Sequence, residues 1–188
     1  MGASVSRHED IINQNRLQII QNMDKPQVVH QAVYNILEQT RKNAGDIGYY
    51  WDKPTPHYKP GGNIETIVEA MQHHPQYAVI QYNCCVCLNN FFHTSYNERA
   101  KKAFVNRAVA AGAYEAIHAC LGNQELTRKL KPQHRNQLQQ MAYRVLCTHP
   151  ALAQGRRSGG GDWKKYWELY ENHSSFGSEV LALGLALL

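Results

Sequence analysis

The 188-residue sequence lacks any long, uninterrupted apolar segment. Its longest apolar run, Val180–Leu188, is broken by Gly184 and falls far short of the roughly 20 residues that a membrane-spanning helix needs. A basic start followed by an apolar stretch is also missing, so we expect no secretory signal. The five cysteines, an odd number, do not indicate a disulfide framework and are typical of a reducing compartment. We therefore expect a cytoplasmic protein without a transmembrane helix.

Short catalytic and cofactor motifs are absent as well. No H-E-x-x-H, G-x-x-x-x-G-K or G-x-S-x-G pattern occurs. Cys84 and Cys87 form a C-x-x-C pair, but a zinc site needs four converging ligands and no second pair follows. Redox pairs sit at the start of a helix, where the dipole lowers the thiol pKa, whereas this pair lies within an apolar helical stripe. We expect buried structural thiols, no metal, no cofactor and no enzymatic activity.

The sequence does contain enough apolar material for one core, with 43% hydrophobic and 19% charged residues. Runs of alternating β-branched residues do not occur; apolar residues instead recur at the helical spacing i, i+4, i+7 and i+8. The clearest stripes begin at Val29, Ile80 and Leu138. Each follows a proline that suits a first helical turn, namely Pro26, Pro75 and Pro132. These patterns predict an all-α fold.

Two segments interrupt the helical pattern. Residues 43–62 contain three tyrosines, one tryptophan and three prolines, which predicts an ordered surface loop. Residues 155–161 are glycine-rich and predict a flexible connector. Beyond the connector, an aromatic stripe over 163–170 and the apolar run 180–188 predict two further helices.

An internal repeat is visible in the central part of the chain. The segments Gly62–Met71 and Gly112–Leu121 each begin a short helix after a glycine, and Glu65 and Glu115 align at a spacing of 50. A longer helix follows each short one. Helical repeats stack because one unit cannot bury its apolar face alone.

The segment Gly62–Ala113 resembles an armadillo repeat. It has a glycine-started second helix, a His-His-Pro linker, a third helix over 80–91 and a following Asn-Glu-Arg first helix over 97–110. The resemblance covers residues 60–150 well, and 16–42 and 162–188 weakly. It implies a right-handed, armadillo-like solenoid of about three repeats within residues 16–188, preceded by an N-terminal segment, 1–15. The spacing of 50 exceeds the usual repeat of about 42 residues, which implies an insertion at 122–131.

In the armadillo family, third helices line a concave groove, where a Trp and, one turn later, an Asn hold an extended peptide. The Asn position falls on Asn90 and the Trp position on Val86, which departs from the family pattern. The resemblance thus implies a non-catalytic interaction module that binds a peptide-like segment of a protein partner. The predicted groove residues, with those one turn earlier, are Gln31, Asn35, Gln39, Tyr82, Val86, Asn90, Gln140, Arg144 and Thr148.

The net charge of +5 is unevenly placed, because residues 97–135 hold eight basic and three acidic side chains. Two alternative functions therefore stay open. One is an RNA-binding helical repeat that uses the basic segment 99–135, and the other is a structural subunit of a larger assembly. In the second case, neighbouring subunits would cover the aromatic loop 43–62 and the C-terminal apolar helix.

The chain begins Met-Gly-Ala-Ser-Val-Ser, which fits the pattern M-G-x-x-x-[ST] for N-myristoylation at Gly2. One myristoyl chain gives only marginal membrane binding, and neither a polybasic patch nor an adjacent cysteine follows it. We expect a cytoplasmic scaffold with weak, peripheral attachment to a membrane surface through Gly2.

Overall fold

The computed structural model describes residues 3–42, 62–93 and 98–148. These residues form helices and the turns between them, without a strand, which confirms the all-α prediction for this part of the chain. Most of the predicted loop 43–62, the connector 155–161 and the helices expected after residue 162 lie outside the described residues. The helices are α1 (Ala3–Gln21), α2 (Pro26–Lys42), α4 (Asn63–His73), α5 (Ala78–His93), α6 (Glu98–Ala110), α7 (Ala113–Gly122), α8 (Gln124–Lys129) and α9 (Pro132–Thr148).

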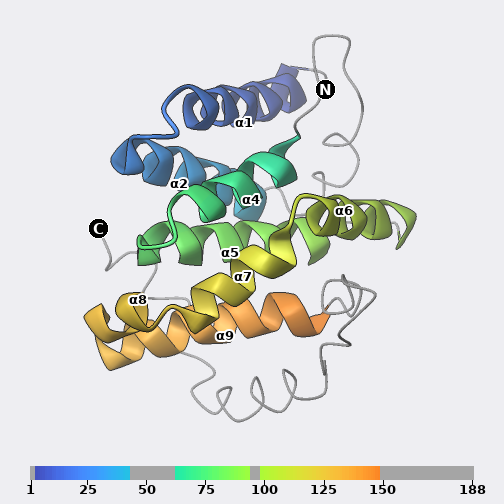
Figure 1. The fold of residues 1–188 in the computed structure, drawn as a ribbon. Helices are drawn as coiled ribbons and strands as arrows, with labels where there is room; N and C mark the ends of the chain where they lie inside the picture. Colours follow the sequence, from blue (N-terminus) through green and yellow to red (C-terminus); the bar gives the residue numbers. More distant parts are fainter. Residues whose placement is uncertain (1–2, 43–61, 94–97, 149–188) are drawn as a thin grey trace.

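Helix α5 is the centre of the structure (Figure 1). It packs between α2 and α9, and it also contacts α4 and α6. The helices α1, α4 and α7 cover α2, α5 and α9 respectively, and α4 contacts both α1 and α7. The same pairing of a covering helix with a long helix therefore occurs three times along the chain.

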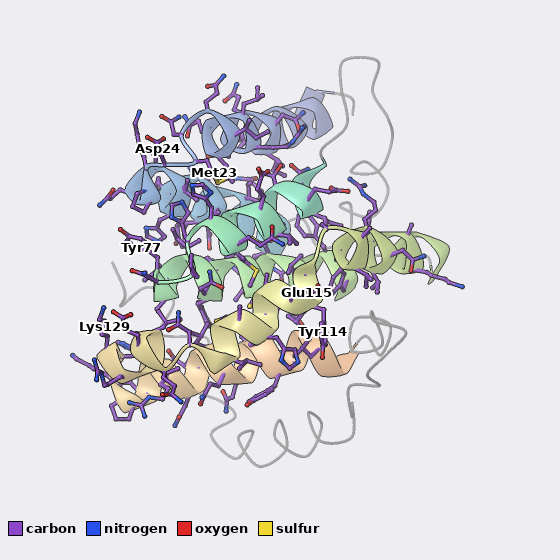
Figure 2. All side chains as sticks on the ribbon, in the orientation of Figure 1. Met23, Asp24, Tyr77, Tyr114, Glu115 and Lys129 are labelled. Atoms are coloured by element: carbon purple, nitrogen blue, oxygen red, sulfur yellow. The ribbon has the colours of Figure 1, made fainter. Side chains whose placement is uncertain are left out.

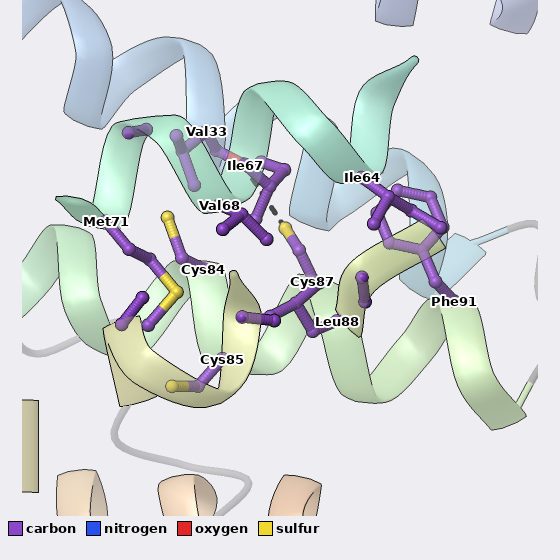
Figure 3. Close-up of a cluster of buried hydrophobic side chains, with 14 of the residues drawn as sticks. Val33, Ile64, Ile67, Val68, Met71, Cys84, Cys85, Cys87, Leu88 and Phe91 are labelled. Atoms are coloured by element: carbon purple, nitrogen blue, oxygen red, sulfur yellow. Dashed lines mark hydrogen bonds between the residues drawn. The ribbon is translucent and has the colours of Figure 1, made fainter. Parts of the chain in front are cut away.

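Part of the core lies between α2, α4 and α5 (Figure 3). Cys84, Cys85 and Cys87 of α5 are fully buried there, among side chains such as Ile67 and Met71. Burial raises the pKa of all three thiols, because a thiolate loses its hydration in an apolar interior. The prediction that Cys84 and Cys87 belong to the apolar stripe is confirmed.

Prolines and glycines mark the starts of several helices. Pro26 and Pro132 are the first residues of α2 and α9, where a proline loses no helical hydrogen bond. Pro75 instead lies in the turn between α4 and α5, before the helix begins. Gly112, the N-cap of α7, has a φ of 86°, a left-handed conformation that favours glycine.

The expected N-terminal segment and the expected insertion both contribute residues to helices. Helix α1 runs continuously through the expected boundary between residues 15 and 16, and its Ile12 is 2% exposed, as part of the core. The residues of the expected insertion, 122–131, contain the short helix α8. No helix in the described ranges is long and apolar enough to cross a membrane.

Candidate binding face

Helix α5 is buried on every side except one. Among its described side chains, those that keep partial exposure are Ala78, Val79, Tyr82, Val86 and Asn90, which recur once per turn along one stripe. We call the surface formed by this stripe and the adjoining sides of α2 and α9 the open face. The predicted residues Tyr82, Val86 and Asn90 all belong to it. The helical period predicts that these three side chains share one side of α5, and neighbouring helices cover the other sides.

A small cavity of about 30 Å³ opens on this face, between the first turns of α5 and α9. Tyr82 lines it and is the one predicted site residue that does so; burial raises the pKa of its phenol. The sequence did not indicate the other lining residues, because their meeting depends on how α9 packs against α5. These are Ala78, Val79, Leu130, His134, Gln137 and Leu138.

The side-chain amide of Asn90, one of the predicted groove residues, forms a hydrogen bond within the protein. Its Nδ2 donates to Thr40 Oγ1 at 2.9 Å, and the Thr40 hydroxyl donates to the carbonyl of Leu37 at 2.6 Å. Asn90 therefore ties the open face of α5 to α2. Its role includes helix packing, which the armadillo resemblance did not indicate.

Asn35 lies away from the α5 stripe. Its Nδ2 donates to Asn15 Oδ1 of α1 at 2.9 Å, and its Oδ1 accepts from Gln31 at 3.1 Å. Asn35 thus stands at the contact of α1 with α2, where its amide stabilises that helix pair.

The remaining predicted residues have the following positions. Gln39 and Gln140 are half-buried, and Arg144 is exposed on α9. The side chain of Thr148 and the predicted lipidation site Gly2 lie outside the described residues. The structure therefore brings together Tyr82, Val86 and Asn90, but does not place Asn35 with them.

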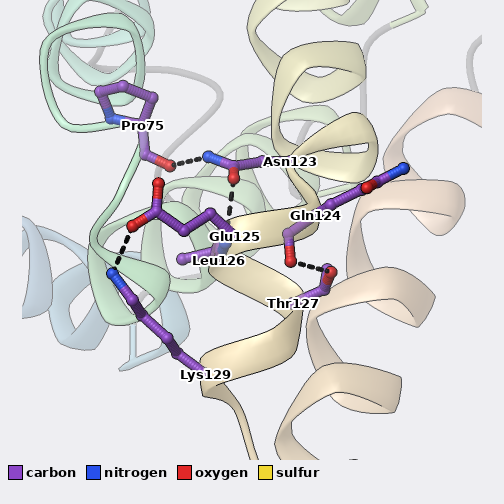
Figure 4. Close-up of polar contacts among 7 residues, drawn as sticks. All are labelled: Pro75, Asn123, Gln124, Glu125, Leu126, Thr127 and Lys129. Carbon is purple, nitrogen blue, oxygen red and sulfur yellow. Dashed lines mark hydrogen bonds and ion pairs between the residues drawn. The ribbon is translucent and has the colours of Figure 1, made fainter.

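The turns that follow α1, α4 and α7 lie along one edge of the molecule, where Figure 2 labels Met23 and Tyr77. His74, the residue that ends α4, makes a ring hydrogen bond to the backbone of Met23 in the preceding turn. Asn123, the residue that ends α7, donates from Nδ2 to the carbonyl of Pro75 at 2.9 Å (Figure 4). Residues at the same position of two successive units therefore make the same contact to the unit before.

Asn123 has a second role, because its Oδ1 accepts from the backbone N–H of Leu126 at 2.9 Å and caps α8 (Figure 4).

Among the described residues, no group of three or more His, Cys, Asp or Glu side chains is placed to hold a metal ion. Comparison of the chain with known protein families, curated proteins and solved structures finds no match.

Proposed function

We propose that this protein is a non-catalytic interaction module, an armadillo-like right-handed solenoid of about three repeats that binds a peptide-like segment of a protein partner across its open face. The observation that carries the proposal is the half-buried stripe Tyr82–Val86–Asn90 on the central helix. It combines an aromatic ring, an aliphatic side chain and a carboxamide on a surface that the other described helices leave partly exposed. Mixed surfaces of this kind suit an extended segment that carries both side chains and backbone polar groups.

The contacts of the basic segment 99–135 favour a protein partner over RNA. Arg107 forms an ion pair with Glu65, and Lys129 forms one with Glu125. Part of the positive charge is thus neutralised within the protein. The aromatic ring of the open face, Tyr82, lies on α5, which carries no Asp, Glu, Lys or Arg. Single-stranded RNA recognition uses basic side chains that alternate with aromatic rings, and α5 lacks this pattern.

Selection from a random peptide library displayed on phage tests the proposal. The matched variants are Val86→Asp on the open face and Val109→Asp on α6, because both valines are half-buried and pack against the same core. We expect recovered peptides to bind the Val86→Asp protein at least about tenfold more weakly, and the Val109→Asp protein as tightly as wild type. Peptides that bind Val86→Asp unchanged, or a selection that recovers no binder, would contradict the proposal.

The proposal includes a weak membrane tether at Gly2, supported by the M-G-x-x-x-S start of the chain. Metabolic labelling with an alkyne analogue of myristate should mark the wild-type protein and leave Gly2→Ala unmarked. An unlabelled wild-type protein, in cells whose transferase labels a known substrate, would remove this part of the proposal.

A further inference from the structure

We propose that the cavity beside Tyr82 takes a small aliphatic side chain of the bound segment, and that the basic residues around it select acidic residues next to that side chain. This inference rests on the proposed function and deepens it, because it states which segment the open face prefers. Two independent observations carry it, the shape and lining of the cavity and the distribution of charge around it.

The lining of the cavity favours an aliphatic group. Ala78, Val79, Leu130 and Leu138 contribute hydrocarbon walls, and Tyr82 also lines the cavity. Its volume of about 30 Å³ corresponds to roughly two water-sized groups. The two methyl groups of a valine side chain match this size, whereas an aromatic ring of six carbon atoms exceeds it. Transfer of such a group from water into the cavity would be favourable, in the manner of apolar ligand pockets.

Within α5 and residues 126–148, no side chain is acidic. Helix α5 contributes no charged residue, and residues 126–148, which contain Leu130, His134 and Leu138, include no Asp or Glu. The same residues include Arg128, Lys129, Lys131 and Arg135.

The nearest acidic residue before this stretch, Glu125, is 2.6 Å from Lys129 and neutralises that lysine (Figure 4). The α9 side of the cavity therefore keeps a positive excess. Such an excess attracts carboxylates, and it penalises a basic segment by like-charge repulsion.

Helix α2 differs in charge from residues 126–148, because its Glu38 forms an ion pair with Arg41 at 3.2 Å and the two charges offset each other. An acidic residue of the partner is therefore selected on the α9 side, close to the cavity, and not along the whole face. The segment that fits has a valine-like residue in the cavity and Asp or Glu immediately beside it.

The peptides recovered from the phage selection provide the probe. We expect them to share an Ala, Val or Ile flanked by Asp or Glu, and replacement of the aliphatic residue by Gly to weaken binding to wild type about tenfold. Ala78→Leu fills the cavity and should remove the effect of that replacement. The matched control is Ala119→Leu on α7, an exposed alanine, which should bind like wild type. Circular dichroism of each variant checks that it is folded.

The exposed residue Lys131 gives a second test that does not alter the core. Lys131→Glu should weaken the binding of the acidic peptides and reduce its salt dependence. Lys102→Glu on α6, at a residue that is also exposed, should change neither. If Ala78→Leu and Lys131→Glu both bind like wild type while Val86→Asp does not, the cavity is not the specificity site and the proposed function stands. If Val86→Asp also binds like wild type, both fail.

Discussion

Gly62 is constrained by a side chain from a distant helix, not by its own backbone. Its φ of −77° is open to any residue. However, the guanidinium of Arg107 lies where a Cβ of residue 62 would be. That guanidinium is held by Glu65 through two bonds, Nε to Oε1 at 2.8 Å and Nη2 to Oε2 at 2.9 Å. Burial by itself would raise the pKa of Glu65, but the hydrogen bond and charge of Arg107, together with backbone hydrogen bonds at Glu65 and Gly62, outweigh burial and lower it.

We expect Gly62→Ala to destabilise the protein by about 1–2 kcal/mol, because the new methyl group must displace Arg107 from its bidentate ion pair. In an Arg107→Ala background the loss should be smaller, because the contact with Arg107 is gone and the Glu65 carboxylate, 2.7 Å from the new Cβ, is the end of a flexible side chain that can turn away. Urea unfolding of the four proteins measures this coupling. An equal loss in both backgrounds would show that the ion pair is not what excludes a side chain at residue 62.

His74 couples the stability of the fold to pH. Burial lowers its pKa below the ordinary value of 6.5, the bond to the Met23 backbone opposes this shift, and neighbouring His73 adds to it. Its Nε2 is buried without a partner, and its ring contacts those of His73 and Tyr77 edge-on. The unfolded chain therefore binds a proton at a higher pH than the folded chain does. The contribution to stability is complete above about pH 6.5 and declines as the pH falls below that value.

We expect the free energy of unfolding to decrease from pH 7.5 to pH 5.5, and the decrease to be smaller in His74→Asn. Asparagine places its Nδ2 where the histidine has Nδ1, so it can keep a bond to Met23, as Asn123 does to Pro75. Chemical unfolding of both proteins at the two pH values is the measurement. An unchanged pH dependence in His74→Asn would assign the effect to His30 and His118, whose pKa values burial also lowers.

At the scale of single residues, sequence pattern placed side chains on the correct side of a helix but did not identify their partners. The helical period places Tyr82, Val86 and Asn90 on one side of α5, and covering helices bury the rest of that helix. The bond from Asn90 to Thr40 joins residues 50 positions apart, and the one from Asn35 to Asn15 spans 20. Such partners depend on how two helices are rotated against each other, which no local pattern specifies.

At the scale of elements, the sequence indicated helices best where capping residues agreed with the apolar stripe. Pro26, Gly62, Gly112 and Pro132 all mark helix starts. Helix α8 was not predicted, because six residues are too few for a periodic pattern. Its start is specified by Asn123, which also joins the turn that ends α7 to the turn between α4 and α5.

The two bonds of Asn123 can be separated by substitution. Asn123→Ser keeps an N-cap oxygen for Leu126 but loses the amide that donates to Pro75, and we expect a loss of about 0.5–1 kcal/mol. Asn123→Ala loses both and should cost about 1–2 kcal/mol. Urea unfolding followed by circular dichroism measures both values. Equal losses in the two variants would mean that the bond between the turns contributes nothing to stability.

At the scale of the whole molecule, α5 makes the fold one cooperative unit. It touches α2, α4, α6 and α9, so its apolar side cannot reach water unless several neighbours separate from it. The sequence predicted all-α structure and stacked units, because an amphipathic helix needs a covering partner. It could not show which helix is central, since this depends on contacts between segments far apart in the chain.

Thiol reactivity offers a test of this cooperativity. The thiols of Cys84, Cys85 and Cys87 on α5 are fully buried, and burial raises the pKa of Cys120 on α7 to about 12. Because the thiolate is the reactive form, all four should resist alkylation in the folded protein. In a Cys147→Ser variant, which leaves these four thiols, we expect mass spectrometry at increasing urea to find either none or all four alkylated. The transition should coincide with the loss of helical circular dichroism. Alkylation of Cys120 alone at lower urea would instead show that α7 and α9 open before α5, as weakly coupled repeats do.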